Sequence, residues 1–560
     1  MKQLLSALFL FASILLFDRC ANPTALSGGD KDTIPPTLIS ANPANQTVNF
    51  KGKEFILYFD ESINADKLSQ ELLITPTTDN RFTHLIRKER LTIKFDEEFD
   101  DSTTYTFNFR NGVGDATEKN PVVNLKLAFS TGTYIDSLMV TGRVTDFIKQ
   151  TPVKSFLISL YNLTDTLSYD LVKPMYFTTT LEDGTFLIEN IKNGKYLLFG
   201  FHDENNNLLF EPSDESFAIH SDTLILDSNY TTDTLNLESL KVNAAKLSFI
   251  SARPSGKTFV ARYNKPLTHI NVKQLNATDT PIKYAPNEDN SELIFYPGRE
   301  TILPEDSIGY IIEVIDTLNN TTIDTVFVKF LESSRKPKEF KASISSSTIR
   351  KDTIHTVLQF NKPISKLNLS QFSLIIDTLL TLRIDSNSLL TSDPFSRKYS
   401  LKTLFSQNTI LDSINSIIAS DSSRTFTELP SVSWTINTDA IQSVEFDTLI
   451  QPITYAITKP KTEDTGTINL TISTEYKSFE VRLINSNGSV IRSFENEKQK
   501  TLTSLPTEKY QIMILIDSNE NGRWDIANPL LNQVSEPIYN YHSQTELRPN
   551  WIIDIEDISF

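Results

Sequence analysis

The sequence predicts an all-β protein built from tandem β-sandwich domains. The chain has 560 residues, which is enough for several domains of about 100–200 residues each. Many runs rich in Thr, Tyr and Phe alternate between polar and apolar residues, and glycine is scarce, at 16 residues; both features favour strands. A stretch of 22 residues also recurs in register 314 residues later, which indicates a duplicated domain.

Successive side chains of a strand point to opposite faces of the sheet, so polar and apolar residues alternate along it. Two runs show this alternation most clearly. In residues 104–110, we expect the aromatic side chains to face inward and the polar ones outward: Tyr105, Phe107 and Phe109 against Thr106, Asn108 and Arg110. In residues 510–516, the two faces carry Tyr510, Ile512, Ile514 and Ile516 on one side and Gln511, Met513 and Leu515 on the other.

Composition and motifs argue against several classes of function. The net charge of −17 disfavours nucleic acid as a partner, since an acidic chain repels phosphate backbones. The single cysteine allows no disulfide framework, and the six scattered histidines form no zinc-binding pattern. The sequence has no G-x-S-x-G, phosphate-binding loop or H-E-x-x-H motif. We therefore expect a protein that is not an enzyme and has no catalytic residues.

The first residues have the pattern of an export signal. Lys2 precedes an uncharged apolar run over residues 4–17, which is shorter than the roughly 20 residues a membrane-spanning helix needs. Residues 1–19 are therefore predicted to be a signal peptide, with residues 20–32 as a flexible tether rich in Gly, Ser and Pro. Cys20, which follows the apolar run after Asp18 and Arg19, resembles the lipidated first residue of bacterial lipoproteins. The alternative is a secreted protein with an unused cysteine.

The recurring stretch contains a candidate metal-binding loop. Asp203, Asn205 and Asn207 of the first copy align with Asp517, Asn519 and Asn521 of the second. Oxygen-bearing side chains at alternate positions can wrap around Ca²⁺, and a glycine such as Gly522 permits the sharp turn.

The second copy is the stronger candidate for calcium. Its ligands would be Asp517, Asn519, Asn521, the carbonyl of Arg523, and Asp525; the first copy offers Asp203, Asn205, Asn207, Glu211 and also Asp214. With few carboxylates, the affinity should be weak. The alternative is a turn in which Asn and Asp side chains cap their own backbone.

Two kinds of domain are identified by resemblance. The segments T-T-Y-T-F-N-F and F-S-T-G within residues 33–133 are similar to the bacterial Ig-like domain of S-layer-associated proteins. Residues 241–335 and 336–455 look like divergent relatives of this domain, mainly because each contains an N-K-P turn. Residues 134–240 resemble the transthyretin-like, carboxypeptidase-regulatory type of β-sandwich, through Gly142, Val144, Asp146, Asp183, Gly184, Phe186, Gly194 and Tyr196. Residues 456–560, with Gly466, Leu505 and Tyr510, resemble it as a second copy.

The chain as a whole resembles a lipoprotein family of Bacteroidota, through Cys20–Asn22, Gly28–Asp32, Pro35–Pro36 and the closing residues 548–557. The resemblance implies a lipid anchor in the outer membrane, no catalytic activity, and binding to other outer-membrane proteins. Residues 21–26 lack the acidic run typical of surface lipoproteins, which favours the periplasmic face. The expected role is a protein-binding scaffold. The alternatives are an accessory subunit of a β-barrel complex, or a surface adhesin or carbohydrate-binding protein.

Overall fold

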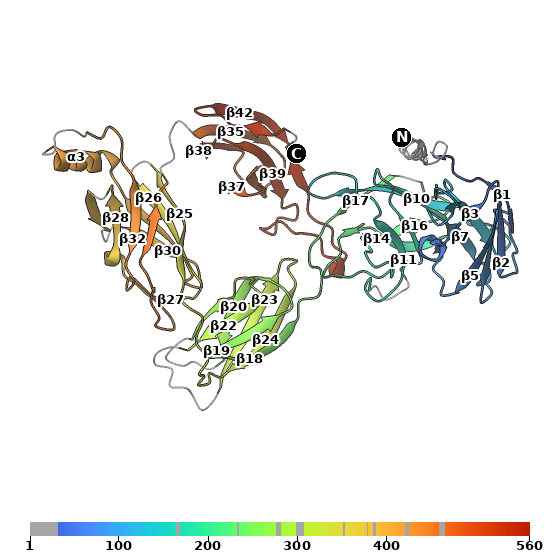
Figure 1. Cartoon of the computed structure of the whole chain (residues 1–560), viewed down its shortest axis with the longest axis horizontal. Helices are drawn as coiled ribbons and strands as arrows, with labels where there is room; N and C mark the ends of the chain where they lie inside the picture. Colours follow the sequence, from blue (N-terminus) through green and yellow to red (C-terminus); the bar gives the residue numbers. More distant parts are fainter. Residues whose placement is uncertain are drawn as a thin grey trace, which may run out of the picture. The chain divides into compact units, whose positions relative to one another are not determined.

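The computed structural model describes residues 32–163, 168–231, 234–275, 282–297, 307–350, 353–377, 379–384, 388–419, 425–458, 465–541 and 543–560 (Figure 1). The predicted all-β fold is confirmed, since nearly all regular structure in these residues is strand. The chain divides into two compact units, residues 1–210 with 216–240, and residues 211–215 with 241–560. No helix in the described ranges is long and apolar enough to cross a membrane.

Domain 1 (residues 38–130) belongs to the first unit. Its larger sheet has the strand order β1, β2, β6, β5: Leu38–Asn42, Glu54–Phe59, Arg90–Phe95 and Phe82–Arg87. Its second sheet has the order β4, β7, β9: Leu73–Thr75, Thr104–Asn108 and Lys126–Ser130. The short strands β3 (Ile63–Asn64) and β8 (Gly114–Asp115) pair with each other, and a four-residue helix α2 (Leu68–Glu71) lies between β3 and β4.

The core between these sheets is aromatic. The ring of Phe55 lies 4.8 Å from that of Phe107 and 4.9 Å from that of Phe129, measured between centroids. Such contacts add to the free energy gained by burying apolar area. Tyr105, Phe107 and Phe109 are buried, as predicted.

Domain 2 (residues 138–239, apart from residues 211–215) completes the first unit with two sheets. One has the order β13, β10, β17: Thr185–Ile191, Leu138–Asp146 and Thr234–Ser239, with β10 and β17 parallel. The other has the order β12, β11, β14, β15: Tyr176–Thr179, Leu157–Asn162, Gly194–Phe201 and Phe217–Ile219. Strand β16 (Leu224–Leu226) also pairs with β14.

Domains 1 and 2 contact each other directly, and this contact corrects one prediction. Thr106 was expected to face outward into solvent but is buried. The side chain of Asn190 in domain 2 donates a hydrogen bond to its hydroxyl at 2.8 Å. The amide of Thr77 also donates to the carbonyl of Met175 at 2.8 Å. A neighbouring domain therefore covers a face that the alternation alone assigns to solvent.

Domains 3 (residues 249–328) and 4 (residues 342–456) belong to the second unit and repeat the four-strand order of domain 1. In domain 3 the order is β18, β19, β22, β21: Phe249–Ser255, Thr258–Tyr263, Glu292–Tyr296 and Lys283–Pro286. In domain 4 it is β25, β26, β31, β30: Ala342–Arg350, Thr353–Phe360, Lys398–Leu404 and Leu389–Ser392.

The opposing sheets of these two domains differ. Domain 3 has the order β20, β23, β24: Leu267–Gln274, Ile308–Asp316 and Thr321–Val328. Domain 4 has the order β29, β28, β32, β34: Leu380–Arg383, Phe372–Ile376, Val432–Ile436 and Ile453–Ala456. It adds a pair of β27 and β33 (Ile364–Leu367 and Ile441–Ser443), a 3-10 turn η1 (Leu369–Gln371), and helix α3 (Gln407–Ile418). This helix was not predicted; it buries Ile410 and Ile414 against the core.

Domain 5 (residues 465–559) has the strand order of domain 2. One sheet has the order β38, β35, β42: Gln499–Pro506, Thr465–Ser473 and Ile552–Ser559, with β35 and β42 parallel. The other has the order β37, β36, β39, β40: Val490–Glu495, Phe479–Asn485, Lys509–Ile516 and Ile538–Asn540; β41 (Thr545–Glu546) also pairs with β39, and η3 (Pro529–Leu531) is a 3-10 turn.

The two copies also share a glycine that their backbone packing requires. A Cβ atom on Gly142 would lie 2.3 Å from the carbonyl oxygen of Leu235, and one on Gly466 would lie 2.9 Å from that of Trp551. Such separations are shorter than a van der Waals contact. In both domains the glycine lets the last strand approach the first strand closely.

Candidate functional site

The loop that follows β39 is organised by a buried carboxylate. The side chain of Asp517 accepts hydrogen bonds from the amides of Asn521 and Gly522 at 3.0 and 2.8 Å, and from the hydroxyl of Ser478 at 2.7 Å. Burial raises the pKa of Asp517, but these donors outweigh it and hold the pKa below its ordinary value. Gly522 has a φ of +88°, a conformation that glycine adopts most easily. The loop therefore folds around its first residue.

Asp525 closes the same loop and is also buried. Its carboxylate accepts hydrogen bonds from the side-chain amides of Asn519 and Asn521, at 3.0 and 2.6 Å, and forms an ion pair with Arg523 at 3.2 Å. Glu536 joins from beyond the loop, because its carboxylate accepts from the amides of Asn519 and Asp525 at 3.0 and 2.8 Å. Glu536 is a member of this network that the sequence pattern did not indicate.

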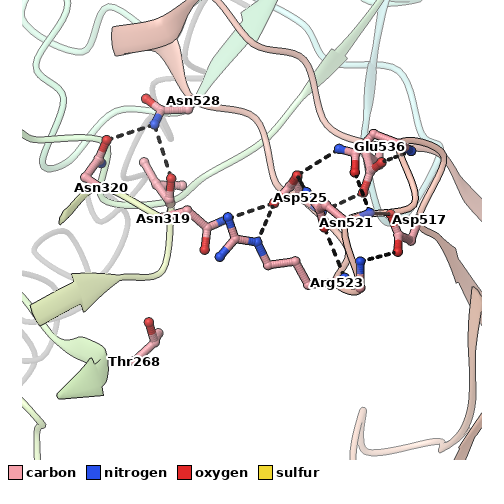
Figure 2. A network of polar contacts seen from close by, with 12 residues as sticks. Thr268, Asn319, Asn320, Asp517, Asn521, Arg523, Asp525, Asn528 and Glu536 are labelled. Atoms are coloured by element: carbon pink, nitrogen blue, oxygen red, sulfur yellow. Dashed lines mark hydrogen bonds and ion pairs between the residues drawn. The ribbon is translucent and has the colours of Figure 1, made fainter. Parts of the chain in front are cut away.

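The loop of domain 5 contacts a turn of domain 3, within the second unit (Figure 2). The side chain of Asn319 donates to the carboxylate of Asp525 at 2.8 Å. Asn528, which is 1% exposed, donates from Nδ2 to the carbonyl of Leu318 at 3.2 Å and to Oδ1 of Asn320 at 3.0 Å. We call this set of contacts the domain 3–5 junction. It joins two segments that lie about two hundred residues apart in the sequence.

A buried ion pair holds the domain 3 side of the junction. Lys265 and Asp316 lie 2.6 Å apart, and their side chains are 1% and 0% exposed. Asp316 also accepts from the amides of Leu318 and Asn320, at 2.8 and 2.9 Å, which shapes the turn that meets domain 5. Thr268 reinforces the turn by donating to the carbonyl of Asp316 at 2.9 Å.

Lys265 also holds the segment that enters domain 3. Its ammonium group donates to the carbonyls of Asn243 and Ala245 at 3.2 and 2.5 Å. Between them, the amide of Ala244 donates to the carbonyl of Pro212 at 2.6 Å. With three acceptors, the buried charge is well compensated.

The lysine of the N-K-P turn in domain 4 also forms a buried ion pair. Lys362 is buried and lies 2.6 Å from both Glu445 and Asp447. The shared N-K-P turn is the sequence signal that locates both lysines, but a turn motif does not by itself indicate a buried ion pair. No sequence pattern indicated Asn319, Asn320 or Asn528.

Domain 1 departs from this arrangement. In the aligned segment, Glu61 stands where domain 3 has Lys265. Burial and the negative charges of Asp32 and Asp115 raise the pKa of Glu61. Asp115 itself is buried and accepts from several amides, including those of Glu118 and Asn120. Burial raises the pKa of Asp115, but these donors hold it well below the ordinary range. In domain 1, the carboxylate of Glu61 therefore lies near other negative charges. At the matching position of domain 3, Lys265 instead pairs with the carboxylate of Asp316.

The first copy of the loop has the same hydrogen-bond pattern. The carboxylate of Asp203 accepts from the amides of Asn207 and Leu208 at 3.1 and 3.0 Å, and Asn205 accepts from Asn207 at 2.9 Å. Leu208 has a φ of +62° where the second copy has Gly522. Glu211 belongs to the second unit, in which its amide donates to Glu215 at 2.9 Å, and Asp214 is exposed.

The polar side chains of the second loop are hydrogen-bonded within the loop. The amide nitrogens of Asn519 and Asn521 point to Asp525, and the oxygens of Asp517 accept amide N–H groups. Within the described ranges, no three His, Cys, Asp or Glu residues are grouped so that they could hold a metal ion. Calcium binding at either loop stays a prediction. Cys20, the predicted lipidation site, lies outside the described residues.

Comparison with known proteins supports the fold of one domain. A family model described as a bacterial Ig-like domain matches residues 32–131, and no curated protein matches the chain. The class defined by fold and site is thus a multidomain β-sandwich protein that contains a bacterial Ig-like domain.

Solved structures show only distant likeness. The Bacillus anthracis TIE protein is 8% identical, with 94% of this chain and 75% of that chain covered and a TM-score of 0.12. The major pilin subunit of Bacillus cereus, BcpA, is 11% identical, with 75% and 99% covered and a TM-score of 0.13. The S-layer protein SbsC is 11% identical, with 92% and 68% covered and a TM-score of 0.14. Scores this low carry no argument about function.

Proposed function

We propose that this chain is a non-enzymatic lipoprotein, anchored in the outer membrane through Cys20, that acts as a scaffold or protein-binding module. The Ig-like match, the sandwich domains and the predicted signal sequence support this proposal. Domains 2 and 5, with their shared strand order, would be the two transthyretin-like domains. The periplasmic face is the proposed side of the membrane.

The domain 3–5 junction is the observation that carries the proposal. Its carboxylates, Asp517, Asp525 and Glu536, accept hydrogen bonds from the loop's own amides and side chains. Groups held in this way fix the backbone and join two domains, which is what a scaffold needs. A catalytic acid or base would instead need to reach a substrate proton.

Two alternative functions would use the same domains differently. An accessory subunit of an outer-membrane β-barrel complex would dock stably on its barrel. A surface adhesin or carbohydrate-binding protein would stay separate from other membrane proteins. The stoichiometry of co-purified proteins therefore distinguishes the alternatives.

A pull-down from native membranes in mild detergent, with quantitative mass spectrometry, tests the proposal. We expect at least one outer-membrane protein to co-purify with the wild-type chain, and to be lost with Cys20→Ser, which removes the anchoring cysteine. A barrel protein at equal stoichiometry would select the accessory-subunit alternative. A wild-type chain that purifies without any partner, or a Cys20→Ser chain that fractionates with the membrane unchanged, would contradict the proposal.

A further inference from the structure

A cavity of about 530 Å³ lies between domains 3 and 4 of the second unit. It is bounded by the β18–β19 hairpin, by the linker at residues 335–338, and by the ends of both domains. The two domains also touch beside it: the rings of Tyr284 and Phe395 lie 6.1 Å apart, and Arg397 donates to the carbonyl of Pro286. The volume falls in the range typical of small-molecule sites, about 300–1,000 Å³.

Part of the charge around the cavity is already paired. Lys338 lies 3.1 Å from Glu288, and Lys362 is neutralised by Glu445 and Asp447. Glu292 pairs with Arg262 at 2.6 Å. These pairs leave the cavity with a smaller set of charged groups that can meet a ligand.

Arg397 also lines the cavity, but it is half-buried and donates to the carbonyl of Pro286. The remaining cations are Lys257, Arg335 and Lys336. All three side chains line the cavity and are exposed, and none forms an ion pair with another described residue. The remaining acid is Asp289. Three exposed cations and one acid give the cavity a local positive charge, whereas the net charge of the whole chain is −17. A local reversal of this kind attracts anionic ligands and repels cationic ones.

The other lining groups distinguish among anions. Asp289 can accept hydrogen bonds from sugar hydroxyls, and an acidic polysaccharide offers such hydroxyls beside each of its carboxylates. The aromatic side chain in the lining, Tyr296, is 5% exposed and offers no platform on which bases could stack. A concave site also suits a chain of sugar rings better than the flat surface of a bilayer.

We propose that the cavity between domains 3 and 4 binds an acidic polysaccharide, with Lys257, Arg335 and Lys336 contacting its carboxylate groups. The inference is independent of the proposed scaffold function, because it concerns a ligand and not a protein partner. The hydroxyl of Ser255 and the carboxylate of Asp289 would contact the sugar hydroxyls.

The test measures binding of the full chain to an oligogalacturonate, a sugar polymer that carries one carboxylate per ring. Isothermal titration calorimetry compares the wild type with the triple variant Lys257→Glu, Arg335→Glu, Lys336→Glu. The matched control is Lys51→Glu, Lys94→Glu, Lys149→Glu, which makes the same change in net charge at exposed lysines of the first unit. A thermal melt of each variant confirms that it is folded.

We expect the wild type to bind oligogalacturonate but not neutral maltohexaose of similar length. The affinity should fall as salt rises, and the triple variant should bind about tenfold more weakly or worse, since three exposed contacts are lost. The control should stay within about twofold of the wild type.

Three results would overturn the inference. The first is a wild-type chain that does not bind oligogalacturonate. The second is an equal loss of affinity for oligogalacturonate in the triple variant and in its control. The third is binding of single-stranded DNA or anionic lipid vesicles that is as tight as binding of oligogalacturonate and is weakened as much by the triple substitution. The last result would keep the anion site but assign it to a different ligand.

Discussion

Asn528 of domain 5 donates a hydrogen bond from Nδ2 to Oδ1 of Asn320 in domain 3 at 3.0 Å, although 208 residues separate the two. Asn528 is buried, and its own Oδ1 accepts from the amide of Leu530 at 3.0 Å. One side chain therefore shapes its own loop and contacts the other domain. This relationship is the basis of the scaffold proposal, and most of the predictions below test the groups around it.

Substitution of Asn528 by alanine should weaken the domain 3–5 junction. The carbonyl of Leu318 and the side chain of Asn320 would each lose a donor, and unpaired buried groups cost about 1–3 kcal/mol. We expect faster proteolysis at the junction and a larger radius of gyration by small-angle X-ray scattering. The exposed Asn487 of the same domain, replaced by alanine, is the control and should change neither measurement. An unchanged scattering profile for Asn528→Ala would argue against the junction.

Substitution of Lys265 by methionine should strongly destabilise domain 3. The change leaves the carboxylate of Asp316 buried without its cation, and breaking such a pair typically costs about 3–5 kcal/mol. Urea unfolding should show this loss, whereas Lys246→Met, at an exposed lysine of the entering segment, should have little effect. A loss below about 1 kcal/mol would show that the pair contributes little.

Substitution of Glu61 by lysine should stabilise domain 1. The variant replaces a like-charge contact with the ion pair that Lys265 and Asp316 form in domain 3. Because the pKa of Glu61 is raised in the folded chain, its charged form opposes folding at neutral pH, and this opposition fades as pH falls and Glu61 is protonated. The thermal midpoint of the variant should therefore exceed that of the wild type most at pH 7 and least near pH 4.

The matched control for Glu61→Lys is Glu54→Lys, which makes the same charge change at an exposed residue of the same domain. It should show a smaller shift, with no comparable dependence on pH between 4 and 7. A Glu61→Lys chain that melts below the wild type at pH 7 would mean that the lysine is not accommodated there.

Substitution of Gly522 by alanine should destabilise the second loop by about 1 kcal/mol. The cost comes from the backbone, since φ is +88° and an added Cβ would meet no atom within 4 Å. The matched control is Gly488→Ala, in a loop away from the junction. Gly488 also has a positive φ and open space around it, so the backbone cost of the substitution should be the same. Chemical denaturation should give similar losses for both variants, but only Gly522→Ala should increase proteolysis at the junction.

Calcium removal should leave domain 5 folded, because hydrogen bonds within the protein already organise the loop. Thermal melts in a chelator should therefore still show a folded domain 5, and a domain that is unfolded in the chelator would contradict this prediction. If the loop binds calcium, as its sequence pattern predicts, millimolar calcium should raise the midpoint of the wild type but not that of Asp517→Asn. The fluorescence of Trp524 within the loop provides a second readout.

The strands could be predicted from the sequence because their alternation is local. Tyr510, Ile512 and Ile514 are all buried on one face, as expected, and the duplicated stretch corresponds to two domains with the same strand order. Helix α3 was missed, since its residues between Gln407 and Ile418 are rich in Ser and Asn, which are poor indicators of a helix.

Contacts between domains could not be predicted in the same way. Thr106 and Asn528 are polar residues that a local pattern assigns to the surface, yet a neighbouring domain covers each of them. Asp517 and Asp525 were identified from their spacing, but spacing alone cannot decide whether their oxygens meet a metal ion or amide N–H groups. The partner of a polar group depends on tertiary structure, which the periodicity of one segment does not contain.

The most direct test of the account is a double-mutant cycle between Asn320 and Asn528. The free energy of unfolding is measured for the wild type, Asn320→Ala, Asn528→Ala and the double variant in the full chain. If the two side chains are hydrogen-bonded across the junction, the losses should be non-additive, with a coupling of about 0.5 kcal/mol or more. Losses that add within about 0.3 kcal/mol would show that domains 3 and 5 do not meet at these residues, and would contradict the scaffold account.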